Sequence, residues 1–232
     1  MIFLTGSSGF VGSSFKNTFS KSDIVIYKYN NFSELFFSEV VLHLAGKSTY
    51  LKETSNSDEY YQVNTELTKK VFDAFLASNA IVFITLSSVK AVKDFLDFDL
   101  TEDIEATPIS IYGQSKLTAE KYLQTKSFNL TYKRVHILRP CMIHGPENKG
   151  NLNMLYKLVS KNIPWPLGAF KNQRSFCSID NFSFIIKELL NNENIISGIY
   201  NVADDDPIST NELIQLIAQS QNRNPKIWNF SK

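Results

Sequence analysis

Tyr112 and Lys116 stand four residues apart, the spacing that brings two side chains to one face of a helix. A phenol with a pKa of about 10 is a poor base at neutral pH, but a neighbouring ammonium group favours the phenolate. Ser88 follows an apolar run at residues 81–85, and its hydroxyl could hydrogen-bond the same reacting oxygen. The three side chains could therefore act together to remove a proton from a substrate hydroxyl group.

Gly6, Gly9 and Gly12 follow a short apolar run, residues 1–4, that has the length of a buried parallel strand. Residues 9–19 are predicted to form the next helix. Glycine permits a tight turn, a close approach of the backbone to a phosphate, and close packing of helix on sheet. The amides at the helix N-terminus attract the same phosphate. The pattern predicts a nucleotide-binding turn, although the spacing departs from G-x-G-x-x-G.

The remaining apolar runs supply the elements that would position these residues. Residues 24–27 and 40–44 are predicted strands, and only about a dozen residues separate them. A helix and a further strand hardly fit there, so we expect a trimmed sheet. A strand over residues 81–85 would place Ser88 at the carboxyl edge of the sheet, where open α/β proteins bind ligands. Helices are predicted at residues 58–78, 112–125, 154–161, 180–190 and 208–220.

Composition excludes several other classes of protein. The 232 residues are 43% hydrophobic and 20% charged, with a net charge of +1 and scattered Lys and Arg, so neither nucleic acid nor an anionic membrane is an expected partner. No run approaches the roughly 20 apolar residues of a membrane span. Cys141 and Cys177 have no paired spacing, and no metal-binding cluster is present. These features, with the absence of a signal peptide, predict a cytoplasmic location.

Seven landmarks occur in an order that resembles the extended short-chain dehydrogenase/reductase family, in its branch of nucleotide-sugar epimerases, dehydratases and reductases. The resemblance covers most of the chain. The landmarks are the glycine turn, Leu42-His43-Leu44-Ala45-Gly46, Asn64, the set Ser88, Tyr112 and Lys116, Leu138-Arg139-Pro140, Gly145-Pro146, and the segment from Arg174 to Asp180.

The resemblance implies an α/β fold, a Rossmann-type doubly wound parallel sheet with a smaller, loop-rich C-terminal substrate lobe. Residues 1–140 would form the NAD(P)-binding domain, with residues 174–190 packing back on it, and residues 141–232 mainly the substrate lobe. The chain ends abruptly where the family usually continues with further helices, so we expect either a naturally short member or a truncated C-terminus. A homodimer through the helices at about 58–78 and 112–125 would follow family habit, unless their apolar faces only cover the sheet.

The resemblance also assigns roles to residues. The implied catalytic residues are Ser88, Tyr112 and Lys116. The implied cofactor contacts are Gly6, Ser8, Gly9, Phe10, Val11, Gly12, Lys28, Leu44, Ala45, Gly46, Asn64, Tyr112, Lys116 and Pro140. The implied substrate contacts are Lys47, Ser88, Asn151, Leu152, Pro166 and Arg174. His43 is interpreted as a strand-end packing residue that lines the cofactor groove.

The resemblance implies NAD or NADP as the cofactor, and the sequence leaves the choice between them open. The acidic residue that commonly follows the second strand in NAD enzymes is absent, and Lys28 could favour the extra phosphate of NADP. Ser88 is followed by Val89 and Lys90 where dehydratases carry an Asp-Glu pair, which argues against dehydration. The segments at residues 87–90 and 145–151 resemble a subgroup that acts on UDP-N-acetylhexosamines for bacterial surface polysaccharide.

A 4-epimerase with Tyr112 as base, acting on a UDP-hexose or UDP-N-acetylhexosamine, is therefore favoured over two alternatives. One alternative is an NADPH-dependent reductase of a 4-keto sugar nucleotide. The other is a catalytically silent cofactor-binding protein on the same fold.

Overall fold

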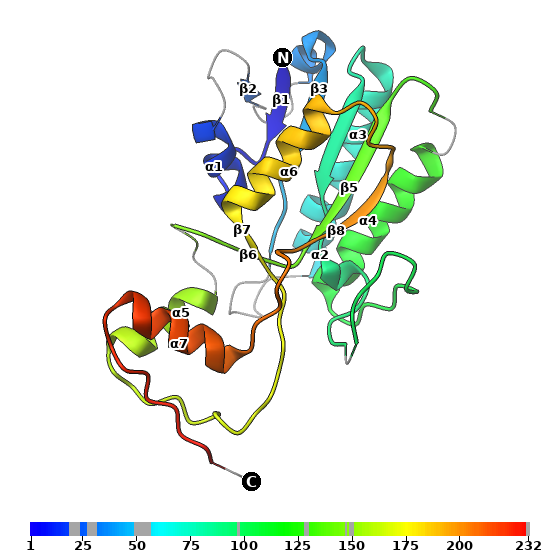
Figure 1. Cartoon of the computed structure of the whole chain (residues 1–232). Helices are drawn as coiled ribbons and strands as arrows, with labels where there is room; N and C mark the ends of the chain where they lie inside the picture. Colours follow the sequence, from blue (N-terminus) through cyan, green and yellow to red (C-terminus); the bar gives the residue numbers. More distant parts are fainter. Residues whose placement is uncertain are drawn as a thin grey trace. The chain divides into compact units, whose positions relative to one another are not determined.

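The computed structural model describes residues 1–18, 24–26, 32–48, 57–96, 98–127, 130–146, 148 and 151–230. They form two compact units, drawn in Figure 1. The first contains residues 1–141 and 179–202, and the second contains residues 142–178 and 203–232. The chain thus leaves the first unit after residue 141, returns to it at residue 179, and leaves it again after residue 202.

A six-stranded sheet organises the first unit, with neighbouring strands parallel throughout. Its order is β2-β1-β3-β4-β5-β8. The strands are β1 (Ile2–Thr5), β2 (Ile24–Ile26), β3 (Val40–His43), β4 (Val82–Leu86), β5 (Arg134–Pro140) and β8 (Gly198–Val202). The predicted Rossmann-type doubly wound sheet is confirmed.

The sheet is shortened where the spacing of the sequence predicted it. Between β2 and β3 the described residues contain only a single-turn 3₁₀ helix, η2 (Ser33–Phe37), and β3 then pairs directly with β1. The chain therefore adds β2 on one side of β1 and β3 on the other, which makes the β1–β3 boundary the topological switch point. Ligands of doubly wound sheets bind outside the strand ends at such a point.

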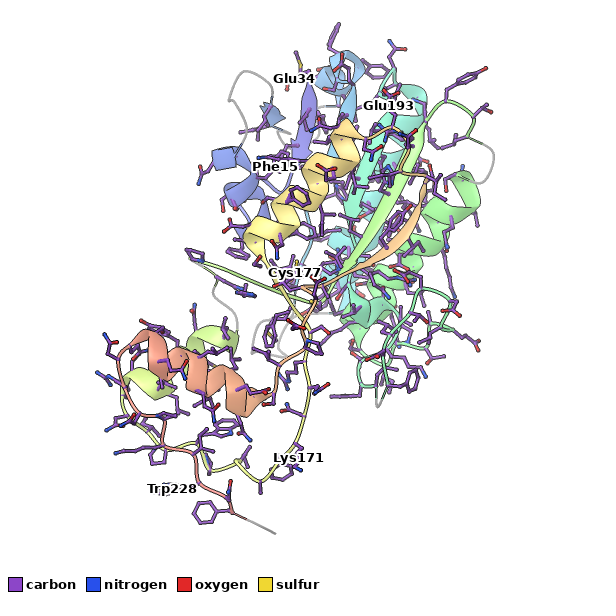
Figure 2. The ribbon with its side chains drawn as sticks, in the orientation of Figure 1. Phe15, Glu34, Lys171, Cys177, Glu193 and Trp228 are labelled. Atoms are coloured by element: carbon purple, nitrogen blue, oxygen red, sulfur yellow. The ribbon has the colours of Figure 1, made fainter. Side chains whose placement is uncertain are left out.

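Helices cover both faces of this sheet (Figure 1). One face carries α3 (Leu67–Ala77) and α4 (Ile111–Ser127), which contact each other; α2 (Ser57–Tyr60) and the π-helix η3 (Tyr61–Glu66) lead into α3. The other carries α1 (Phe10–Thr18) and α6 (Ile179–Asn191), which also contact each other. Phe15 of α1, labelled in Figure 2, is fully buried.

Strand alternation explains which residues meet α3 and α4. Side chains two residues apart on a strand share a face. Phe3, Val41, Phe83 and Val135 are partners in register, and they join one buried cluster with Val71, Phe72 and Phe75 of α3 and Leu123 of α4. Two residues further along, Thr5, His43 and Thr85 lie on that same face. The polar residues at the strand ends are therefore directed toward α3 and α4.

The second unit is smaller and richer in loops. A two-stranded parallel ribbon, β6 (Met142–His144) and β7 (Phe176–Ser178), accompanies α5 (Asn151–Ser160) and α7 (Thr210–Ser220), which pack together. Ser209 and Glu212 form a reciprocal capping box at the start of α7, as their spacing predicted. Residues 226–229 pair with residues 165–168 by backbone hydrogen bonds, an arrangement that sequence reasoning did not anticipate.

The segment that returns to the first unit is residues 179–202, whereas residues 174–190 were expected. The difference arises because β8 pairs with β5 along its whole length and so belongs to the large sheet. In the described residues, no helix is long and apolar enough to cross a membrane.

Candidate active site

The glycine turn closes the gap between β1 and β3 at the switch point. Gly6 has a φ of +72°, and a Cβ there would lie 2.4 Å from the Ala45 amide nitrogen. A Cβ on Gly12 would lie 2.2 Å from the Gly6 carbonyl oxygen, so α1 packs directly on the turn. A Cβ on Gly9 would meet only that same oxygen, at 3.4 Å. Gly9 and Ser8 are exposed at the start of α1, which leaves its first amides accessible to an anion.

A directional chain of hydrogen bonds links β1, β3 and α3. Thr68 donates its hydroxyl to the Asn64 carbonyl (2.8 Å), so its oxygen accepts from His43 Nε2–H (2.8 Å). His43 Nδ1 then accepts from the Thr5 hydroxyl (2.7 Å), whose oxygen accepts the Ala45 amide (3.2 Å). The chain fixes the neutral Nε2–H tautomer of His43 and ties the loop after β3 to the glycine strand.

Asn64 fastens that loop to α4. Its amide group accepts from the Lys47 backbone N–H (2.8 Å) and donates to the Lys47 carbonyl (3.0 Å) and to Ser115 Oγ (3.0 Å). Asn64 is fully buried within the π-helix η3, and such π-bulges are frequent at functional sites. A Cβ on Gly46, the residue before Lys47, would lie 3.0 Å from Lys116 Nζ. The Leu44–Lys47 loop therefore passes beside Lys116.

Tyr112 lies in the first turn of α4, which packs closely on the loop after β4. A Cβ on the neighbouring Gly113 would lie 2.3 Å from the Lys90 carbonyl oxygen, so no larger residue fits there. The half-buried Tyr112 ring also meets the buried Tyr60 ring edge-on, with centroids 6.4 Å apart. These contacts hold Tyr112 beside η4 (Val89–Ala91), the single turn that Ser88 caps.

Ser88 makes a structural hydrogen bond that leaves its hydroxyl proton available for a ligand. Its Oγ accepts the Lys90 N–H at 3.2 Å and caps η4. A hydroxyl oxygen that accepts one hydrogen bond still has its own proton to donate. Ser88 is therefore able to cap the turn and to donate a hydrogen bond to a ligand oxygen.

Lys116 is buried, and its Nζ donates to the Leu86 carbonyl at 2.7 Å. Burial lowers the pKa of Lys116 to about 8, although the Glu120 carboxylate acts in the opposite direction. A cavity of about 10 Å³, room for about one water molecule, adjoins Lys116, Glu120, Ser87 and Asn64. Lys116 is thus a sheltered cation one helical turn from Tyr112, the arrangement that stabilises a phenolate.

Glu120 and Arg139 form a buried ion pair that sequence reasoning missed. Glu120 accepts two hydrogen bonds from the Arg139 guanidinium, at 3.0 and 2.7 Å, and a third from the Ser87 hydroxyl. In the sequence, Arg139 is part of the Leu138-Arg139-Pro140 landmark and carries no further signal. The position of Glu120 could have indicated this role, because Glu120 lies four residues after Lys116, on the helix face that Tyr112 and Lys116 share.

The remaining predicted residues fall into three groups. Phe10 and Val11 begin α1, and the buried Pro140 ends β5. In the second unit Leu152 packs on the core of that unit, Pro166 is exposed, and the exposed Arg174 is held by two backbone hydrogen bonds to Ile208. Lys28 lies outside the described residues, and of Asn151 only the backbone is described. In the described ranges no three His, Cys, Asp or Glu residues could hold a metal ion.

His43 and His136 should make the protein sensitive to acid. Burial, with the nearby Lys116, lowers the pKa of His43 to about 3, and burial with Arg134 lowers that of His136 to about 4. An unfolded histidine has a pKa of about 6.5, so below that pH only the unfolded chain takes up these protons. Stability is then lost as the pH falls, by up to about 1.4 kcal/mol per pH unit for each histidine.

The variant His136→Leu tests this expectation. Within the described part of the chain neither ring nitrogen of His136 has a hydrogen-bond partner, so Leu should preserve or raise the melting temperature at pH 7. Its melting temperature should also fall less than that of wild type between about pH 7.5 and 5, measured by circular dichroism. Equal losses in both proteins would show that His136 does not contribute.

Comparisons with known proteins agree with this geometry. The model of the NAD dependent epimerase/dehydratase family matches residues 28–203. A UDP-glucose 4-epimerase of Vibrio cholerae is 31% identical over 94% of this chain and 74% of its own length. The N-acetyl-α-D-glucosaminyl-diphospho-ditrans,octacis-undecaprenol 4-epimerase of Escherichia coli O157:H7 is 28% identical over 96% of this chain and 72% of its own.

Solved structures agree on the fold. The UDP-N-acetylglucosamine 4-epimerase of Bacillus cereus superposes with a TM-score of 0.82 at 19% identity, over 98% of this chain and 83% of its own. A Bacillus cereus UDP-glucuronic acid 4-epimerase with NAD gives 0.82 at 20% identity, over 97% and 84%. The predicted family and its nicotinamide dinucleotide cofactor, NAD or NADP, are thereby confirmed. The chain belongs to the NAD dependent epimerase/dehydratase family.

Proposed function

We propose that the protein is a nucleotide-sugar 4-epimerase that acts on a UDP-hexose or UDP-N-acetylhexosamine, with Tyr112 as the catalytic base. The observation that carries the proposal is the buried Lys116 cation, held on Leu86 one helical turn from Tyr112 and beside the Ser88 cap. The epimerase names of the relatives support the same reaction.

The residues at the switch point fit a dinucleotide. The Gly6 to Gly12 cradle leaves no room for a Cβ at either end, yet a Cβ on Gly9 would find space, and Ser8 and Gly9 are exposed. The glycine turn and the first amides of α1 would hold the diphosphate. The loop from Leu44 to Gly46, with Lys116, would hold the nicotinamide ribose. A bound nicotinamide supplies a hydride acceptor and donor.

The side chains of this chain would manage the proton. Lys116 stabilises the Tyr112 phenolate, which removes the proton of the sugar 4-hydroxyl as hydride leaves C4. Ser88 donates a hydrogen bond to the same oxygen and fixes its position. Return of the proton from Tyr112 and of the hydride to the opposite face of C4 gives the epimer. Arg174 would bind the nucleotide diphosphate through its planar, two-pronged guanidinium.

Nuclear magnetic resonance of UDP-GlcNAc and UDP-glucose, each incubated with the protein and catalytic NAD, tests the proposal. The C4 epimer should appear without net consumption of cofactor. Loss of NADPH in proportion to a supplied 4-keto-6-deoxy sugar, with no epimer from either substrate, would instead establish the reductase. Cofactor binding with no turnover in any arm would favour the catalytically silent alternative.

A sugar carried on a lipid diphosphate is a second candidate substrate, favoured by exposed apolar side chains next to the proposed base. Phe95 and Ile109 are 90% and 80% exposed, and Ile111 directly precedes Tyr112. The Asp94 carboxylate accepts the backbone N–H groups of Ile109 and Ser110, which joins the two segments. The name of one relative specifies a substrate of this kind.

If the lipid carrier contacts these residues, Phe95→Ser should slow epimerisation of polyprenyl-diphosphate-linked GlcNAc about tenfold and leave UDP-GlcNAc unaffected. Tyr132→Ser is the control, because Tyr132 is 88% exposed just before β5, at the opposite edge of the sheet. Equal effects of Phe95→Ser on both substrates would exclude a contact with the lipid.

A further inference from the structure

Two consecutive residues at the end of β4 are held by one face of α4. The Leu86 carbonyl accepts from Lys116, and the Ser87 hydroxyl donates to Glu120. Ser88, the next residue, caps η4 beside the first turn of the helix. Tyr112, Lys116 and Glu120 lie on successive turns of that face, so the contacts of Lys116 and Glu120 fix the position of the first turn, which carries Tyr112, beside η4.

Arg139 completes this attachment from the neighbouring strand. Residues 85 and 137 are register partners, so the alternation of side chains brings Ser87 and Arg139 to the face that α4 covers. Arg139 and Glu120 have side chains that are 6% and 2% exposed, and the pair is bidentate. A buried pair of this kind seldom adds net stability, so its effect is to be sought in the position and the charge that it gives to its neighbours.

We propose that Glu120, paired with Arg139 and Ser87, is a positioning residue that seats α4 on β4 and sets the charge state of Lys116. This inference rests on the proposed function of Tyr112 and Lys116. The Glu120 carboxylate favours the Lys116 ammonium, whereas Arg139 neutralises part of that effect. The pair thereby balances the field at Lys116, and through it the ability of Tyr112 to act as a base.

Other charged groups near Lys116 do not supply this balance. Among the described residues, His43 on β3 stays neutral because its pKa is lowered to about 3. Lys47, in the loop after β3, is paired with Glu59. Lys90 on η4 is exposed, and its charge acts on the Asp94 carboxylate. Besides burial, the Glu120 carboxylate is therefore the charged group that acts on Lys116, and Arg139 is the partner of that carboxylate.

The test is a titration of lysine side chains labelled with ¹³C at Cε, in cofactor-free protein. Comparison with Lys116→Met assigns the Lys116 signal. Glu120→Gln should lower the titration midpoint of Lys116 by about one pH unit, because a carboxylate that favours the ammonium is removed. Arg139→Met should raise this midpoint. The double variant, with Glu120→Gln and Arg139→Met together, should have a Lys116 midpoint close to that of wild type.

The double variant differs from Arg139→Met only at residue 120. Comparing the Lys116 midpoints of these two proteins therefore measures the effect of Glu120, even if Glu120→Gln alone does not fold. A Lys116 midpoint that is the same in every folded variant would overturn the inference. In turnover assays, the acidic limb of the kcat/KM profile should move to higher pH in Glu120→Gln. A wild-type protein without turnover would refute the proposed function, whereas the titration would still decide the role of Glu120.

Discussion

Replacing Tyr112 by phenylalanine should lower the turnover of the epimerase substrate by about 10² to 10⁴-fold, the usual contribution of a general base. The phenylalanine ring keeps the edge-on contact with Tyr60, and Gly113 keeps α4 seated on the Lys90 carbonyl. The helix should therefore stay in place, and only the proton acceptor is lost. Turnover is measured by nuclear magnetic resonance, and cofactor affinity by isothermal titration calorimetry.

Tyr122→Phe is the matched control, since Tyr122 lies on the same helix and donates its hydroxyl to Asp73 on α3. This variant should retain nearly full turnover, because the lost contact is exposed and distant from Lys116. If Tyr112→Phe turns over substrate as fast as Tyr122→Phe, the base is another group. A loss of cofactor binding in Tyr112→Phe would point to disruption of the cofactor site.

The second large effect is expected at the glycine cradle. Gly12→Ala would place a Cβ 2.2 Å from the Gly6 carbonyl oxygen, where backbone surrounds it and nothing flexible can move aside. Overpacking of this kind costs about 3 kcal/mol or more. The melting temperature should fall by roughly 10 °C in thermal unfolding followed by circular dichroism, with loss of cofactor binding.

The variant Gly9→Ala separates an effect on the stability of the fold from an effect on cofactor binding. Its Cβ would meet only the Gly6 oxygen at 3.4 Å, an ordinary contact, so the melting temperature should change by no more than a few degrees. Cofactor affinity should nevertheless fall at least tenfold, because the methyl group would occupy the space proposed for the diphosphate. Unchanged affinity in Gly9→Ala would place the diphosphate elsewhere, and a stable Gly12→Ala would contradict the cradle geometry.

Local patterns in the sequence accounted for most of the helices and strands. The strand over residues 40–44, the cap at Ser209 and the helix that carries Tyr112 each depend on interactions within a few residues, so periodicity and capping signals predict them. The short β2–β3 connection was predictable for a similar reason, because too few residues were available for another helix and strand.

Contacts between distant segments could not be predicted in this way. The strand β8 contains the strand-favouring residues Ile199, Tyr200 and Val202, but this short run does not show that it pairs with β5. The pairing of residues 226–229 with residues 165–168 likewise depends on tertiary packing. Because the position of β8 in the sheet was not predicted, the expected end of the returning segment was too early.

The sequence by itself determined the chemistry available to this protein: a glycine turn after the first strand, and a tyrosine, lysine and serine placed to meet at the carboxyl edge of a parallel sheet. Tertiary structure alone decided how that chemistry is controlled. Burial lowers the pKa of Lys116 to about 8, and the Glu120–Arg139 pair faces it from two elements. Residue type and spacing specify which groups are present, but burial and charge balance arise only when distant strands and helices exclude water together.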